Sequence, residues 1–237
     1  YGNGGEIIKI SKFLKSKKII LIEDAAEALG SKIKSKYLGT IGDIGTFSFH
    51  ATKNITTGEG GCVVSRDKNF IEKVKLFRSH GVKSKRYFHY VPGHNFRLTN
   101  LQAAVGFSQI KKIKKIISKR KWIYKIYLGL FKNLNINNFF IQKIQKNMDF
   151  VPWTLAINLN SHTKKSRDKI IFKMMKKKVE TRNGFYFPNK LPMYKKIKNL
   201  QNSLKLSNQV ICLPIFFDLD KKMIKKISET FKVCLKK

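Results

Sequence analysis

Apolar residues follow two different spacings in the first quarter of the chain. Between residues 6 and 14 they recur at helical intervals, which predicts a helix with one buried face. Residues 18–22 then form a mostly apolar run that ends at Glu23 and Asp24, as in a buried strand of a parallel sheet. A helix followed by such a strand predicts an α/β layer, in which ligands bind beyond the carboxyl ends of the strands.

The rest of the pattern predicts elements on both sides of one long helical stretch. Thr99 and Gln102 form a capping-box pattern at its beginning, and its apolar positions extend to about residue 134 with room for one break. We expect a large domain and its linking helix in residues 1–134, and a small C-terminal α+β domain in residues 135–237. Strands are predicted at residues 46–49, 61–65 and 150–159, and helices at residues 67–77, 168–178 and 221–234.

The chain carries a formal net charge of +36, almost all of it from lysine. Such a charge is typical of proteins that bind nucleic acids, but here it accompanies many isoleucines and asparagines and few arginines. We therefore interpret the lysine runs as solvated helix faces and expect no specific nucleic-acid partner, although some attraction for phosphate-bearing ligands remains. A basic protein that binds polyanions stays open as an alternative class.

Composition also limits where the protein works and what it binds. No apolar run approaches the roughly 18 residues that a membrane span requires, and no segment at the start has the pattern of a signal peptide. Cys62, Cys212 and Cys234 are too scattered for a zinc site or a disulfide framework. We therefore expect a cytoplasmic protein with no membrane contact and no metal.

Residues 46–61 hold the clearest chemical pattern. A short strand delivers Ser48, a lone lysine follows at Lys53, and a Thr-Thr-Gly-Glu-Gly-Gly run lets the backbone turn sharply. A lysine that forms a Schiff base and a carboxylate that pairs with a protonated pyridine nitrogen are the two groups that pyridoxal phosphate chemistry requires. Lys53 and Asp24 fit these roles. Judged on its own, Asp24 fits a strand-end turn or a helix cap equally well, and Ser48 fits a strand serine bonded to backbone.

Together these segments resemble the sugar-nucleotide aminotransferases of the DegT/DnrJ/StrS family, whose Glu-Asp-Ala-Ala-Glu motif stands intact after the first strand. The resemblance implies a fold-type-I transferase, with part of its mainly parallel large-domain sheet, and pyridoxal 5'-phosphate as the cofactor. It implies that Asp24 binds the pyridine nitrogen, that Ala26 packs against the ring and that Glu27 lies near the phenolic oxygen. It further implies that Ser48 binds the phosphate and that Lys53 forms the Schiff base.

Other segments resemble the parts of that family that bind substrate or the partner subunit. A Gly-His-Asn-Phe-Arg run is similar to the family's Gly-Tyr-Asn-Tyr-Arg motif, whose asparagine reaches the phosphate in the neighbouring subunit, so Asn95 implies a homodimer with shared active sites. Residues 180–194 resemble the perosamine-synthase-type members, and Arg182 is a candidate for binding the anionic substrate. His50 and His89 are further candidates for substrate contact, although each fits a packed residue equally well.

The resemblance implies transfer of an amino group from an amino acid, with glutamate as the expected donor, to a keto carbon of a nucleotide-linked deoxy sugar for polysaccharide or O-antigen synthesis. Asn183 stands where the family has a proline, and Asn189 and Lys190 stand where it has a histidine, so the sugar and nucleotide stay open. The family's Gly-Thr phosphate loop and its ring-stacking aromatic residue are missing, so we expect an N-terminally truncated chain. A truncated, inactive remnant or dimerisation partner of such an enzyme is therefore the alternative.

Overall fold

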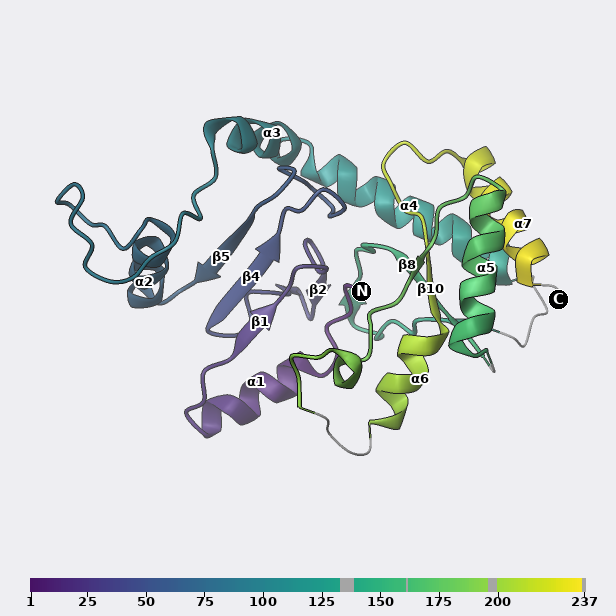
Figure 1. The fold of residues 1–237 in the computed structure, drawn as a ribbon, viewed down its shortest axis with the longest axis horizontal. Coiled ribbons are helices and arrows are strands. Elements are labelled where there is room, and N and C mark those ends of the chain that lie inside the picture. Colours follow the sequence, from purple (N-terminus) through teal and green to yellow (C-terminus); the bar gives the residue numbers. More distant parts are fainter. Residues whose placement is uncertain (133–138, 161, 196–199, 236–237) are drawn as a thin grey trace. The chain divides into compact units, whose positions relative to one another are not determined.

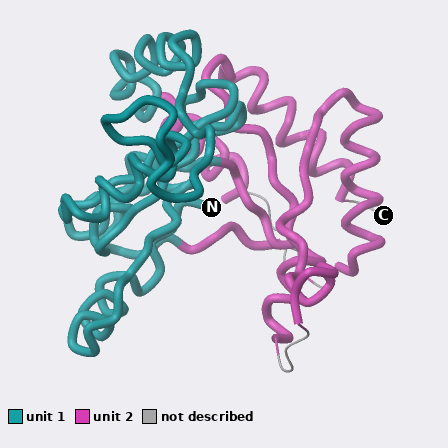
Figure 2. Tube along the Cα trace, turned by 60° about the vertical axis from the view of Figure 1, so that its left-hand side comes forward, with its two compact units in different colours: residues 1–118, 144–153 teal, residues 119–143, 154–237 magenta. Residues whose placement is uncertain are grey.

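The chain forms two compact units. Figure 1 shows the whole chain as a ribbon, and Figure 2 gives each unit its own colour. The computed structural model describes residues 1–132, 139–160, 162–195 and 200–235. The first unit comprises residues 1–118 and 144–153, and the second comprises residues 119–143 and 154–237. The expected boundary between residues 134 and 135 lies outside the described residues and stays a prediction.

The first unit contains a three-stranded sheet in the order β1–β4–β5 and a smaller one in the order β3–β2–β7 (Figure 1). Its elements are α1 (Ile7–Ser16), β1 (Ile22–Asp24), β2 (Lys32–Ile33), β3 (Lys36–Tyr37), β4 (Ile44–Ser48), β5 (Gly61–Ser65), α2 (Lys68–Arg78), α3 (Asn100–Ile110), the beginning of α4 (Ile113–Lys132) and β7 (Met148–Asp149). β1 lies parallel to β4, with Asp24 opposite Thr46, whereas β5 lies antiparallel to β4. The carboxyl ends of β1 and β4 therefore meet at one edge of the sheet.

Residues 49–60, which contain Lys53 and are called the lysine turn below, explain why β5 does not continue the parallel sheet that the sequence predicted. A parallel neighbour requires a crossover of about a dozen residues or more, usually through a helix. The chain between β4 and β5, all of it described, forms no helix and turns back at Gly58 and Gly60, whose φ angles are 80° and 149°. Thr57 N–H donates to Phe49 O at 2.9 Å, and Phe49 N–H donates to Gly60 O at 2.8 Å. The result is a wide antiparallel turn that carries Lys53.

Buried side chains tie the segment after β7 to the rest of the first unit. Ser31 is fully buried, and its Oγ accepts a hydrogen bond from Val151 N–H at 3.0 Å. The buried apolar cluster of this unit is formed by Ala25, Ala28, Ile33 and Leu38. The chain consequently remains part of the first unit as far as Trp153.

The second unit is an α+β layer whose four-stranded sheet is antiparallel throughout, in the order β6–β8–β10–β9. Its elements are the remainder of α4, β6 (Phe139–Ile141), β8 (Leu155–Leu159), α5 (Lys164–Lys176), β9 (Arg182–Asn183), the 3₁₀ helix η1 (Pro188–Lys190), α6 (Gln201–Gln209), β10 (Val210–Leu213) and α7 (Lys221–Leu235). Every residue of β8 and β10 is buried, and α5 packs against α7. The predicted α/β class with an α+β C-terminal part is confirmed.

Most predicted helices occur close to their expected bounds. The capping box of Thr99 and Gln102 is present, and the long helical stretch divides once, between α3 and α4. The strand expected at residues 150–159 is shorter than predicted and begins at Leu155. Pro152 supplies the physical reason, because proline has no N–H to donate to a strand ladder.

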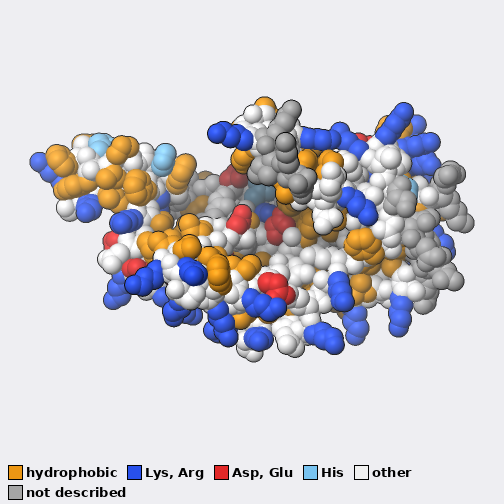
Figure 3. All heavy atoms as spheres, turned by 90° about the horizontal axis from the view of Figure 1, so that it is seen from below, with side chains coloured by type: hydrophobic (Ala, Val, Ile, Leu, Met, Phe, Trp, Pro, Cys, Tyr) orange, Lys and Arg blue, Asp and Glu red, His pale blue; other side chains and the backbone are white. Residues whose placement is uncertain are grey.

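Basic side chains are spread over many elements on the face seen in Figure 3, where they are blue, and do not gather into one patch. No helix in the described part of the chain is both long enough and apolar enough to cross a membrane.

Candidate functional site

Lys53 lies in the turn between β4 and β5, and hydrogen bonds fix the residues on both sides of it. Trp153 Nε1–H donates to Thr52 O at 2.9 Å. Asn54 Nδ2–H donates to Leu29 O at 3.2 Å. The backbone that carries the lysine is therefore anchored to two segments that are distant in the sequence.

The side chain of Lys53 is largely enclosed, with 14% of its surface exposed. Its Nζ lies 3.7 Å from Glu27 Oε1 and 4.2 Å from the centroid of the Trp153 ring. One contact presents a carboxylate and the other the electron-rich face of an aromatic ring, two partners that an amine group commonly has in proteins. The amine thus occupies a defined position between these two side chains.

Helix α3 holds the far side of the same turn. Gln109 bonds to both backbone groups of Thr56: its Oε1 accepts from Thr56 N–H at 3.0 Å, and its Nε2–H donates to Thr56 O at 2.7 Å. Gln102 Nε2–H donates to Glu59 O at 3.3 Å. The capping box that begins α3 thus also contributes a contact to the lysine turn.

Asp24 and Ser48 lie at the same edge of the sheet. Since Asp24 pairs with Thr46 across parallel strands, Ser48 follows two positions further along β4, about 7 Å beyond that pair. Each side chain also makes a local turn bond: Asp24 Oδ1 accepts from Ala26 N–H at 3.1 Å, and Ser48 Oγ accepts from His50 N–H at 3.3 Å. Asp24 is exposed and Ser48 is half-buried.

Glu23 has a structural role that the sequence motif did not reveal. It is buried, and its two carboxylate oxygens accept three backbone N–H bonds, from Gly39 at 2.9 Å, Ile41 at 2.6 Å and Gly42 at 2.6 Å. A charged carboxylate that is removed from water is stabilised by such donors. Glu23 therefore fixes the chain before β4, while its neighbour Asp24 points outward.

The histidine candidates and Asn95 lie on exposed segments of the first unit. His50 Nε2 lies 3.6 Å from Glu59 Oε1, and His50 Nδ1 lies 3.2 Å from Thr52 Oγ1. His89 Nδ1 is 2.6 Å from His80 O. Asn95 is exposed, and its backbone bridges to Ser79 after α2.

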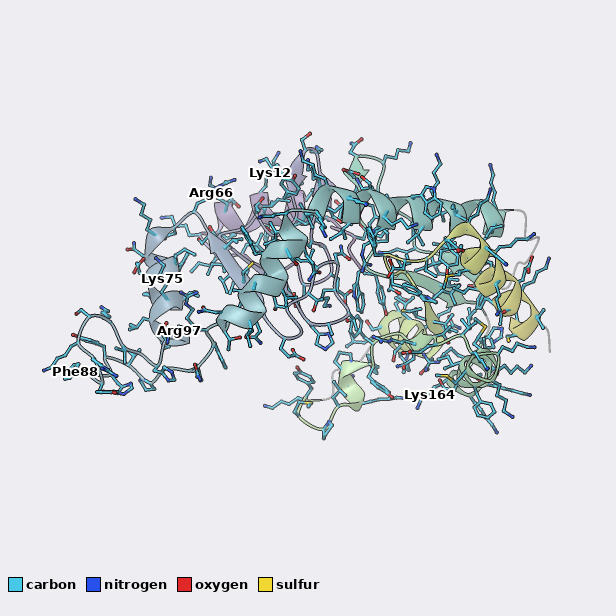
Figure 4. The ribbon with its side chains drawn as sticks, turned by 90° about the horizontal axis from the view of Figure 1, so that it is seen from above. Lys12, Arg66, Lys75, Phe88, Arg97 and Lys164 are labelled. Atoms are coloured by element: carbon cyan, nitrogen blue, oxygen red, sulfur yellow. The ribbon has the colours of Figure 1, made fainter. Side chains whose placement is uncertain are left out.

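The segment that carries His89 and Asn95 extends away from α2. Phe88 and Arg97 of this segment are labelled in Figure 4. Exposed aromatic and basic side chains dominate it. Tyr87, Phe88, Tyr90 and Phe96 are all exposed, and Lys83, Lys85 and Arg86 lie over aromatic rings of the same segment. An exposed aromatic segment of this kind is typical of an interface.

Arg182 belongs to the second unit, on β9. Its guanidinium is exposed and lies 3.4 Å from Glu180 Oε1. The sequence candidates thus fall into three groups: the turn and strand ends around Lys53, the exposed segment with Asn95, and Arg182.

Sequence reasoning missed Trp153 and Gln109, which both bond to the lysine turn. Trp153 stands in a run that predicted a strand, and Gln109 lies inside a helical pattern. Their contacts join residues 101 and 53 positions apart, so no local spacing could have signalled them.

Comparisons with known proteins agree with the motifs. The model of the DegT/DnrJ/EryC1/StrS aminotransferase family matches residues 1–232. The chain is 36% identical over 233 residues to "GDP-perosamine synthase" of Escherichia coli O157:H7, an alignment that covers 97% of this chain and 62% of that protein. It is 44% identical over 129 residues to "UDP-4-amino-4,6-dideoxy-N-acetyl-beta-L-altrosamine transaminase" of Campylobacter jejuni serotype O:23/36, covering 53% of this chain and 34% of that protein.

The fold agrees as well. The structure of Helicobacter pylori PseC, described as an aminotransferase involved in the biosynthesis of pseudoaminic acid, superposes with a TM-score of 0.88 at 28% identity, covering 98% of this chain and 64% of PseC. The chain therefore spans less than two thirds of the length of these relatives. A family match over nearly every residue and a shared fold-type-I architecture lead to one conclusion: the chain belongs to the DegT/DnrJ/EryC1/StrS aminotransferase family.

Proposed function

We propose that this chain forms part of a pyridoxal phosphate-dependent aminotransferase in which Lys53 is the residue that bonds to the cofactor. The observation that carries the proposal is the enclosed amine of Lys53, which lies between Glu27 and Trp153 in a turn that is hydrogen-bonded on both sides. A lysine that attacks a carbonyl needs such a fixed position, since misplacement of the reacting atoms is costly in rate.

The side chains at this edge of the sheet fit the cofactor by their chemistry. Asp24 offers an exposed carboxylate for a protonated pyridine nitrogen, and Ser48 offers a hydroxyl for a phosphate oxygen. Ala26 is small and half-buried, which suits the close approach of a flat ring. When bound, pyridoxal phosphate withdraws electrons from the donor carbon that loses its proton.

Lys53 has two roles in this proposal. Its amine bonds to the cofactor at rest, and once displaced by the amino donor it moves a proton to and from the substrate carbon that carries nitrogen. Glu27, whose Oε1 lies 3.7 Å from Nζ, is placed to hold that amine. The bond that Thr52 O accepts and the bond that the Asn54 side chain donates hold the two residues beside Lys53 while its own side chain moves.

For the acceptor we propose a nucleotide-linked keto-deoxy sugar, with glutamate as the donor and polysaccharide or O-antigen synthesis as the destination. The names of the relatives support this class, because one is a GDP-perosamine synthase and another is a transaminase of a UDP-linked sugar. GDP-4-keto-6-deoxymannose is the first acceptor to test, since the first of these matches covers nearly the whole chain. Arg182, an exposed guanidinium, suits two-point binding of a phosphate or carboxylate.

We also propose that the enzyme works in the cytoplasm, where nucleotide-linked sugars are made, and as a homodimer with shared sites. The exposed aromatic segment around Asn95 supports the dimer, because large apolar side chains gathered on a surface are costly to leave in water.

An amino-transfer assay with glutamate and a panel of GDP-, UDP- and dTDP-linked keto sugars tests the proposal. The GDP sugar is expected to react, Lys53→Ala to abolish transfer, and Lys75→Ala to leave it unchanged, because Lys75 is an exposed residue of α2 paired with Glu72 (Figure 4). Transfer by the Lys53→Ala variant would contradict the role of this lysine. Preference for a UDP or dTDP sugar would overturn the acceptor alone, and a protein that transfers to no acceptor and binds no cofactor would favour the inactive alternative.

A further inference from the structure

Trp153 contacts the lysine turn in two separate ways. Its indole N–H donates to Thr52 O at 2.9 Å, which fixes the peptide immediately before Lys53. Its ring face lies 4.2 Å from the Lys53 amine, within the range of a cation–π contact. One side chain therefore restrains both the backbone and the reactive atom of the same residue.

Trp153 is itself held in place. Two residues earlier, Val151 is fully buried and its N–H donates to the buried Ser31 Oγ at 3.0 Å. Pro152 lies between them and limits the backbone angles of the connection. The indole therefore reaches the lysine turn from a buried and hydrogen-bonded segment of the first unit.

Glu27 is a second neighbour of the amine. Its Oε1 lies 3.7 Å from Lys53 Nζ, longer than a short charge-assisted hydrogen bond, and its carboxylate is largely enclosed. An ion pair of this length fixes the position of the amine loosely. The flat ring on another side limits the directions in which the amine can move.

We infer that Trp153 is a positioning residue for Lys53: its N–H fixes the peptide and its ring face holds the amine while the amine is not bonded to the cofactor. The inference rests on the proposed function, in which Lys53 must be released and must then act on a proton from a defined place. The two contacts need different groups: holding the peptide needs a donor at Nε1, and holding the amine needs an electron-rich ring.

The rate at which acetic anhydride acetylates Lys53, measured by mass spectrometry without cofactor, tests the inference. Only an unprotonated, accessible amine reacts, so loss of the ring is expected to raise the rate. Trp153→Leu should raise it about threefold to tenfold, the factor that corresponds to loss of one cation–π contact. The matched control is Trp122→Leu, since Trp122 on α4 lies over Lys119 at 4.1 Å in the same kind of pair. That change should leave Lys53 unaffected.

Fluorinated tryptophans separate a specific contact from a general loosening of the fold. In a Trp122→Phe background, Trp153 is the one tryptophan left to be replaced. Added fluorines withdraw electrons from the ring face but preserve its shape and its N–H, so the acetylation rate of Lys53 should rise stepwise with each fluorine. A flat series would overturn the role of the ring face, and it would do so even if Trp153→Leu failed to fold.

The N–H is tested by Trp153→Phe, which keeps a ring face and loses the donor. Hydrogen exchange at the Lys53 amide should then accelerate about threefold to tenfold, the factor for one net hydrogen bond. Unchanged exchange would overturn the role of the N–H. These measurements need no cofactor, so a negative result alongside a borohydride-trapped adduct on Lys53 would overturn the role of Trp153 alone. An adduct on another lysine would overturn the proposed function and this inference with it.

Discussion

Glu23 and Asp24 are neighbours at the end of β1, yet their side chains have different roles. Glu23 turns inward and accepts three backbone N–H bonds, whereas Asp24 is exposed at the edge that carries the candidate site. The alternation of a strand produces this division, because successive side chains point to opposite faces. The acidic pair of the motif therefore combines one structural carboxylate with one that is available to a ligand.

Replacing Glu23 with glutamine should destabilise the first unit by about 2–4 kcal/mol, because an amide nitrogen would face N–H donors and the charge assistance would be lost. Urea unfolding of Glu23→Gln against the parent chain measures the change. Glu72→Gln is the matched control: Glu72 is exposed and pairs with Lys75, so its urea midpoint should barely move. Equal midpoints for the two variants would show that the buried carboxylate contributes nothing special.

Sequence reasoning identified the residue types of the site better than their contacts. Lys53, Asp24 and Ser48 were predicted from a local motif, because the chemistry of each is carried by the residue itself. Trp153 was not found, because its relation to Lys53 exists only after the chain has brought residues 100 positions apart together. The roles of Lys53, Asp24 and Ser48 toward a cofactor stay predictions.

Helix α3 and the lysine turn form one supported structure. Gln109 bonds to both the N–H and the carbonyl of Thr56. The turn is therefore stabilised by a helix that begins with a capping box. Hydrogen bonds of this kind replace the regular ladder that a loop lacks. The position of Lys53 therefore depends on an element that contributes no chemistry of its own.

Removing this support should loosen the turn. Gln109→Leu leaves two backbone groups of Thr56 without partners, which is expected to cost about 1–3 kcal/mol of stability and to speed amide exchange at Thr56. Native-state hydrogen exchange measures the effect. Ser108→Ala is the control, because it removes only the bond that Ser108 Oγ–H donates to Val105 O within the same helix. It should leave exchange at Thr56 unchanged. Slow exchange at Thr56 in the Gln109 variant would mean that the turn is held elsewhere.

Long helices were predictable from the sequence and short strands were not. The helix predicted at residues 67–77 occurs at Lys68–Arg78, because Asp67 caps it by accepting from Asn69 N–H at 2.7 Å. Strands β2, β3 and β7 have two residues each, too few to display any period. β10 is an apolar run of four, which a sequence pattern cannot distinguish from buried helix.

The two units differ in architecture, and the second depends on a buried aromatic core. Tyr127 is fully buried, and its hydroxyl donates to Pro214 O at 3.1 Å. Burial raises the pKa of Tyr124 to about 12 and also raises the pKa of Tyr127 well above its ordinary value. Removing these phenols from water disfavours their charged forms.

The second unit should therefore lose stability at high pH. An unfolded tyrosine has a pKa near 10, so the stabilising contribution is complete below about pH 10 and is lost as the pH rises toward 12. Urea midpoints at pH 9 and pH 11, with tyrosinate absorbance recorded in parallel, measure this loss. Tyr124→Phe should remove part of the late-titrating absorbance and flatten the alkaline decline. A parent chain whose tyrosines all titrate near pH 10 would contradict the burial argument.

Shared sites in a dimer can be tested by mixing two variants that are each impaired when the cofactor is scarce. Asn95→Ala should weaken cofactor binding by roughly tenfold to a hundredfold, the factor for a lost charge-assisted hydrogen bond to phosphate, and Lys53→Ala should abolish transfer. If Asn95 acts across the interface, a heterodimer of the two places both lesions in one site and leaves the other intact, so activity should return on mixing. At a limiting cofactor concentration, a mixture no more active than the average of its two components would rule out a shared site.

Lys53 is proposed to be the lysine that bonds to pyridoxal phosphate. The most direct measurement is borohydride reduction of the protein with the cofactor, followed by peptide mapping by mass spectrometry. We predict that the adduct forms on the peptide that contains Lys53 and that it disappears in Lys53→Ala. An adduct on any other lysine, or one that persists in Lys53→Ala, would contradict the account.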